Sequence, residues 1–169
     1  MNPIDLKTEP VKPYEMDDAH RRLSRLVGRW RGTARTLMGP DADPLEAPWE
    51  GEVTSLLGGR FVRFTYRSSV QGTLIAGDMT LAYEAGEKQW RISWIDSFHT
   101  SPAILVSTGP AKDGPINVFA KYFAAEGHPH WGWRSEVHDP DGDGWTVRMF
   151  NVTPEGEELL GIEILLTRA

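Results

Sequence analysis

The sequence predicts an all-β protein in which about ten strands form a closed up-and-down antiparallel β-barrel with one short N-terminal helix. Two observations carry this prediction. After Gly28 the spacing of apolar residues changes from about 3.6 to about 2, as expected where helix gives way to strands. The strand candidates follow one another through short connections containing Gly or Pro, with no long helical crossover of the kind parallel strands need. Closure removes the two edges that an open sheet would expose.

The helix is expected over residues 15–27, after an extended arm formed by the proline-containing residues 1–14. Asp17 and Asp18 lie near its start and arginines follow later, which is the order that a helix dipole favours. Gly28 is a suitable residue to end it.

Ten segments show strand-like alternation or composition, and with the helix they are expected to make a single barrel domain over residues 15–169. The segments are residues 29–38, 49–57, 60–70, 73–84, 88–96, 103–109, 115–125, 130–138, 144–153 and 157–168.

Alternation within these segments predicts an aromatic interior, because the faces that bear five of the seven Trp residues, in three of the segments, are the more apolar ones. A barrel of this size encloses more space than a few side chains fill, so a cavity for a small ligand is expected. The side chains predicted to bind that ligand are Tyr66, Trp90, Trp94, Asp96, His99, Trp133, Trp145 and Arg148. Trp30 is expected to close one barrel end beneath the helix, with Arg168 stacked on it.

Composition excludes several classes of protein. The chain has 18 Lys and Arg against 24 Asp and Glu, a net charge of −6, which argues against a nucleic-acid partner. The absence of Cys excludes disulfides, Cys-ligated metal sites and a cysteine nucleophile. No apolar run approaches the ~20 residues of a membrane helix, and the N-terminus is unlike a signal peptide, so no membrane partner and a cytoplasmic location are expected.

No metal and no cofactor are expected. His128, His130 and His138 are all at even positions, so they could share one face of a strand. In an extended chain, however, His130 and His138 are about 26 Å apart, at about 3.3 Å per residue, so the three cannot bind one metal ion together. His128 and His130 alone could supply two ligands, although surface histidines around a turn are the favoured interpretation.

The segment around Asp96 has two interpretations. Asp96 and His99 could act as acid and base toward a ligand on an otherwise aromatic face. Alternatively, Asp96 is a rim carboxylate that hydrogen-bonds the turn through Ser97 or Thr100, and this interpretation is favoured. The catalytic residues therefore stay unknown.

Four stretches resemble a bacterial family known as domain of unknown function 1579, over about residues 20–168. They are residues 20–30 (HRRLSRLVGRW), residues 57–62 (LGGRFV), the Gly72 and Gly77 pair, and residues 94–97 (WIDS). The Gly-x-Trp after a helix is also similar to calycins, the lipocalin-like and fatty-acid-binding-protein-like barrels. The resemblance implies a closed antiparallel calycin-like barrel with a helix near one end, and no activity. Two stretches depart from the family pattern, Ala82-Tyr83-Glu84 and Leu166-Thr167-Arg168.

Three functions remain open. The favoured one is a carrier or sensor that binds a small apolar or aromatic molecule inside the barrel. The alternative is a barrel enzyme, such as an isomerase, cyclase or hydrolase, that uses Asp96 and His99. A third is haem binding, by analogy with nitrobindin-type barrels. A homodimer through an outer barrel face is compatible with all three.

Overall fold

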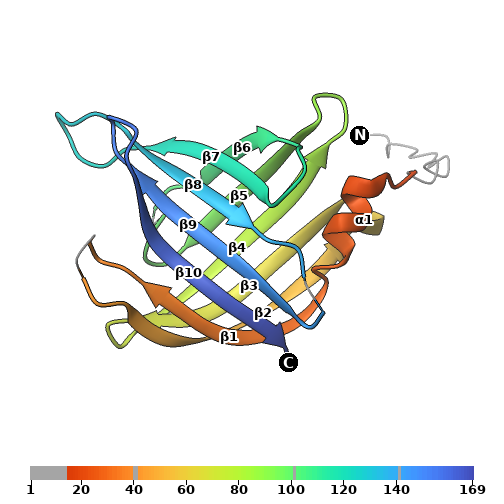
Figure 1. Ribbon diagram of the computed structural model, residues 1–169, viewed down its shortest axis with the longest axis horizontal. Coiled ribbons are helices and arrows are strands. Elements are labelled where there is room, and N and C mark those ends of the chain that lie inside the picture. The colour runs from red at the N-terminus through yellow and green to blue at the C-terminus, as the bar shows by residue number, and fades with distance from the viewer. Residues whose placement is uncertain (1–14, 40–41, 101, 141) are drawn as a thin grey trace, which may run out of the picture.

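Ten antiparallel strands close into a barrel in the computed structural model, which describes residues 15–39, 42–100, 102–140 and 142–169 (Figure 1). Each strand pairs with its neighbours in the sequence, and β1 pairs with β10 to complete the ring. The predicted fold class is therefore confirmed. The arm predicted for residues 1–14 lies outside the described residues.

The elements follow the order that the sequence predicts. Helix α1 spans Asp18–Ser24, and a short 3-10 turn covers Leu57–Gly59 between the second and third strands. The strands are β1 (Gly28–Thr36), β2 (Leu45–Leu56), β3 (Phe61–Val70), β4 (Thr73–Glu84), β5 (Gln89–Asp96), β6 (Leu105–Pro110), β7 (Ile116–Tyr122), β8 (Trp131–Val137), β9 (Gly144–Val152) and β10 (Glu158–Arg168).

The inward faces are those that alternation predicts. In β5 the buried side chains are Trp90, Ile92, Trp94 and Asp96, while the residues between them are more exposed. Six of the seven Trp residues belong to the buried core, and Trp131, at the start of β8, is half-buried. The interior is therefore built largely from aromatic rings in contact with one another.

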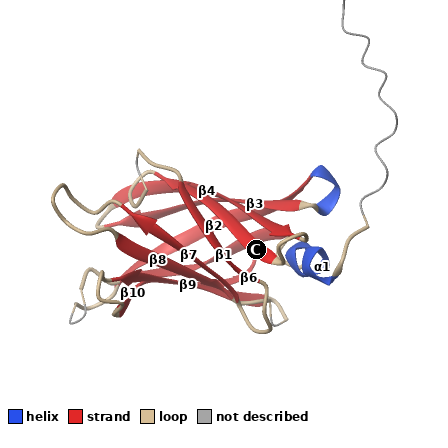
Figure 2. Ribbon diagram, turned by 90° about the horizontal axis from the view of Figure 1, so that it is seen from above, coloured by secondary structure: helices blue, strands red, loops and turns tan. Residues whose placement is uncertain are grey.

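Helix α1 closes one end of the barrel beside the end of β10 (Figure 2). Asp17 caps it by accepting a hydrogen bond from the backbone N–H of His20 at 3.0 Å. Below the helix, Trp30 donates its indole N–H to the carbonyl of Leu26 at 2.7 Å, and the Arg168 guanidinium lies 4.3 Å from the centre of the Trp30 ring. The predicted end closure is confirmed.

Several boundaries differ from the predictions, including both ends of the helix, the start of β2 and the end of β7. The helix ends at Ser24 because the chain must turn before β1, and Gly28 makes that turn with a φ of 143°. Strand β2 begins at Leu45, four residues earlier than expected, because pairing with β1 continues through Pro48 to Leu45. Cross-strand pairing overrides the weak strand preference of proline here.

The other end of the barrel is where the candidate site lies. Because neighbouring strands run in opposite directions, the ends of β1, β5, β7 and β9 meet the starts of β6, β8 and β10 at this rim. A register shift between Leu160 and Ile162 places a bulge in β10 beside the rim. Among the described residues, no helix has the length and hydrophobicity to cross a membrane.

Candidate functional site

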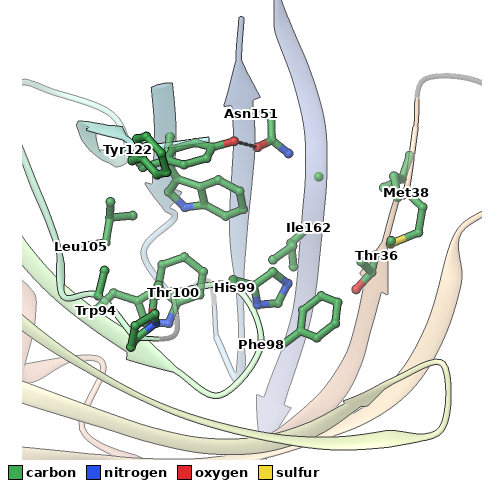
Figure 3. Close-up of a pocket in the computed structure, with 16 residues that line it drawn as sticks. Thr36, Met38, Trp94, Phe98, His99, Thr100, Leu105, Tyr122, Asn151 and Ile162 are labelled. Carbon is green, nitrogen blue, oxygen red and sulfur yellow. Dashed lines mark hydrogen bonds between the residues drawn. The ribbon is translucent and has the colours of Figure 1, made fainter. Parts of the chain in front are cut away.

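A pocket of about 520 Å³ opens at the barrel end opposite α1 (Figure 3). Its walls come from strand ends and from the segment between β5 and β6. The lining residues are Thr36, Leu37, Met38, Trp94, Phe98, His99, Thr100, Pro102, Ala103, Leu105, Tyr122, Phe123, Trp133, Asn151, Gly161 and Ile162. None of these is Asp, Glu, Lys or Arg, so the described lining of this end pocket carries no permanently charged side chain.

The floor of the end pocket separates it from a smaller space in the barrel. This inner void, of about 20 Å³, shares Thr36, Trp94, His99 and Ile162 with the end pocket and also touches Tyr66. His99 therefore lines both spaces. Its ring centre lies 5.5 Å from that of Trp94 and 4.9 Å from that of Phe98, so aromatic packing holds the imidazole in place.

Asp96 holds the turn that brings His99 to this floor. It is the last residue of β5, and alternation turns its side chain into the barrel, where it is fully buried. Its Oδ1 accepts the backbone N–H groups of Phe98, at 2.7 Å, and of His99. Its own N–H donates to Oγ1 of Thr100 at 2.6 Å. The carboxylate thus folds residues 97–100 back over the barrel mouth as an Asx-type turn.

The second carboxylate oxygen of Asp96 is shared by two side chains. Oδ2 accepts the hydroxyl of Tyr66 at 2.9 Å and contacts Nδ1 of His99 at 2.8 Å. Trp94 donates its indole N–H to the Tyr66 oxygen at 2.9 Å. Burial acts to raise the pKa of Asp96, but the hydrogen bonds and charge of His99 and the backbone N–H of Phe98 outweigh it, so this pKa lies below its ordinary value.

The network determines the tautomer of His99. Burial and the nearby Asp96 carboxylate raise the pKa of Tyr66, so its hydroxyl keeps its proton and donates it to Asp96. The ionised carboxylate is only an acceptor, so Nδ1 of His99 must carry the hydrogen in their contact. In neutral imidazole Nε2 is then an acceptor. This atom is buried and has no hydrogen-bond partner among the described residues.

A second polar pair lies on another wall of the end pocket. Tyr122, at the end of β7, donates its hydroxyl to Oδ1 of Asn151 in β9 at 2.8 Å (Figure 3). Burial raises the pKa of Tyr122, so this group is a neutral hydroxyl. Apart from His99, the polar side chains of the pocket are therefore uncharged hydroxyls and one amide, in an otherwise apolar and aromatic lining.

The structure brings five of the eight predicted ligand-binding residues to this end of the barrel. Trp94, His99 and Trp133 line the end pocket, while Tyr66 and Asp96 lie behind His99 and hold it. The turn contacts predicted for Asp96 are present in part: its N–H reaches Thr100, while its carboxylate binds the N–H groups of Phe98 and His99 instead of Ser97. Its contact with the His99 ring allows acid–base chemistry toward a ligand, which stays a prediction.

The other three predicted residues lie elsewhere. Trp90 packs against Tyr83 with ring centres 5.1 Å apart, and Trp145 packs against Trp30 at 5.6 Å, both in the half of the barrel near α1. Arg148 lies on the outer face, where it pairs with Glu163 at 2.9 Å. Burial of an unpaired cation is costly, which explains why Arg148 faces outward rather than toward the pocket.

Several lining residues were not predicted from the sequence. Asn151 lies on the same strand face as Trp145 and Met149, and Tyr122 has the parity of Ile116 and Val118, so alternation could have indicated both. Phe98 lies outside the strands and gave no periodic signal, whereas Met38 stood at the end of the predicted strand 29–38 with the parity of Trp30 and was not singled out. Within the described part of the chain, no group of three or more His, Cys, Asp or Glu residues could hold a metal ion.

Fold and site together define a closed ten-stranded antiparallel barrel with an apolar pocket at one end. The chain belongs to the family of proteins of unknown function DUF1579, whose model matches residues 15–168. No curated protein matches the sequence.

Solved structures that share the fold include the following two. One is Rv2717c from M. tuberculosis, with a TM-score of 0.60 and 16% identity over 92% of this chain and 99% of that chain. Another is the S-type phycobiliprotein lyase CPES from Guillardia theta, with a TM-score of 0.55 and 14% identity over 89% of this chain and 92% of that chain. At these identities the similarity is one of fold.

Proposed function

We propose that this protein is a carrier or sensor that binds one small apolar or aromatic molecule in the end pocket. The observation that carries the proposal is a space of about 520 Å³ whose described lining is largely apolar and aromatic, with a few polar side chains and no Asp, Glu, Lys or Arg. Pockets of roughly 300–1,000 Å³ with such walls are typical of small-molecule sites. The same fold occurs in a protein named as a phycobiliprotein lyase, which supports a role for this architecture in ligand handling.

The proposal is tested by filling the end pocket from one wall. Leu105 lines the pocket, whereas the next residue, Val106, is 55% exposed and does not line it. The probe is prodan, a neutral naphthalene dye whose emission shifts to the blue in apolar surroundings. We expect saturable binding to the wild type, and binding at least about tenfold weaker for Leu105→Trp, because the added indole occupies the site.

Val106→Trp is the matched control, and its affinity for prodan should equal that of the wild type. Equal binding by the two Trp variants, or no saturable binding by the wild type, would contradict the proposal. An absorbance scan of the purified protein checks the haem alternative. A Soret band would show bound haem and would support haem, instead of a small apolar molecule, as the ligand.

A barrel enzyme is the second candidate, and the Asp96–His99 pair is the observation that favours it. A buried carboxylate that orients an imidazole beside a pocket is a recurring arrangement for acid–base chemistry. Any molecule that copurifies with the protein is incubated with fresh wild type and with Asp96→Asn, and followed by chromatography. Conversion by the wild type that falls at least about 100-fold in Asp96→Asn supports an enzyme, whereas an unchanged molecule supports the carrier.

A further inference from the structure

The unpaired nitrogen of His99 determines which chemical group the ligand must carry. Nε2 is shielded from solvent and has no hydrogen-bond partner within the described chain. A buried polar atom without a partner is costly. Among the described residues that line the end pocket, His99 (Nε2) and Trp133 (Nε1) have such an atom, and only the imidazole nitrogen can accept a hydrogen bond. Asp96 occupies Nδ1, so the ring offers Nε2 as an acceptor in its neutral form.

The space around His99 limits the size of that group. The imidazole lines both the end pocket, of about 520 Å³, and the inner void, of about 20 Å³. A space of roughly 10–15 Å³ is enough for a single water-sized group. The end pocket therefore suits a ring system, and its floor at His99 suits one small polar substituent of that ring system, such as a hydroxyl.

Electrostatics select against an anion at this point. The described lining of the end pocket has no Lys or Arg, and the ionised Asp96 carboxylate lies 2.8 Å behind Nδ1 of His99. A carboxylate ligand would lose its hydration without gaining a fixed cationic partner. A neutral O–H group loses less hydration and pairs with Nε2.

From this geometry we infer that the ligand class is a neutral aromatic molecule with a hydroxyl, a phenol or naphthol type, whose O–H donates to Nε2 of His99. The inference rests on the proposed function, since it names the chemistry of the molecule held in the same end pocket. Trp94 and Trp133 provide aromatic surface for the ring system, and Asp96 keeps His99 in the accepting tautomer.

The test compares four probes of similar size against the wild-type protein by isothermal titration calorimetry. They are 2-naphthol, 2-methoxynaphthalene, naphthalene and 2-naphthoate. We expect 2-naphthol to bind at least about tenfold more tightly than each of the other three, because only it is both neutral and a donor. This comparison needs no variant, so it holds even if a substitution at His99 disturbs folding.

The variant His99→Phe keeps a ring at the floor and removes the acceptor. In this protein 2-naphthol and 2-methoxynaphthalene should bind with about equal affinity, because neither finds an acceptor at the floor. Equal wild-type affinity for 2-naphthol and 2-methoxynaphthalene, or tighter binding of 2-naphthoate, would overturn the inference but leave the proposed function standing. No binding of any of the four probes would instead count against the proposed function itself.

Discussion

Replacing Asp96 with alanine is expected to lower the free energy of unfolding by about 3–5 kcal/mol, with a fall of roughly 10 °C in the melting temperature. The side chain is fully buried and accepts hydrogen bonds from Tyr66, from the His99 ring and from two backbone N–H groups of the turn. Alanine leaves all these donors without an acceptor inside the barrel, which is more costly than the loss of one exposed contact. Urea unfolding at neutral pH, followed by Trp fluorescence, measures the change.

The variant Asp96→Asn separates the contribution of the side chain's shape to stability from the contribution of its charge. It keeps one oxygen acceptor at nearly the same volume, so its loss of stability should lie between zero and that of Asp96→Ala. The pKa of Asp96 is lower in the folded protein than its ordinary value of 3.8. The carboxylate therefore stabilises the fold above this ordinary value, and that contribution is lost as the pH falls through the folded pKa.

Because the folded pKa of Asp96 is lowered, the stability that its carboxylate contributes depends on pH. The difference in the free energy of unfolding between the wild type and Asp96→Asn should shrink as the pH falls from about 5 through the folded pKa of Asp96. Using the difference cancels the titration of other carboxylates, such as Asp17 and Glu136, whose pKa values are also lowered. A difference that grows as the pH falls would contradict the role assigned to the ionised carboxylate.

The barrel could be predicted because the sequence features that indicate strands and turns are local. Alternation assigns each side chain to one face of its strand, and Gly and Pro mark the turns, so ten sequential strands imply a closed meander. The beginning of β2 was missed because its first four residues are held by their pairing with β1, which is a tertiary contact. Local preference around Pro48 opposes a strand there.

The candidate site was predicted only in part because alternation gives the face of a strand but not the height along the barrel axis. Trp90 and Trp94 share one face of β5, yet Trp90 packs near the helix and Trp94 lines the end pocket. Height depends on strand tilt and register, which are fixed only when the sheet closes. The contact of His99 with Asp96 was within reach of the sequence because the two residues are three apart.

Closure of the barrel makes Gly32→Ala the other substitution with a large expected effect. A methyl group at Gly32 would lie 1.8 Å from the carbonyl oxygen of Leu165 and 2.9 Å from its carbonyl carbon. These are backbone atoms of β10, and β1 pairs with β10 from Trp30 to Thr36, so no side-chain rotation can relieve the clash. The two strands must separate at the seam that completes the ring. We expect a loss of about 3 kcal/mol or more, and a fall of roughly 10 °C in the melting temperature.

The matched control is Gly86→Ala, in the exposed turn between β4 and β5. A methyl group there meets no heavy atom within 4 Å, and the backbone is outside the positive-φ region. Its stability should stay within about 0.5 kcal/mol of the wild type, as is usual for surface substitutions. Thermal unfolding followed by circular dichroism compares the two variants directly. Equal melting temperatures would mean that β1 and β10 can part at Gly32 without loss, and that the seam contributes little to holding the barrel closed.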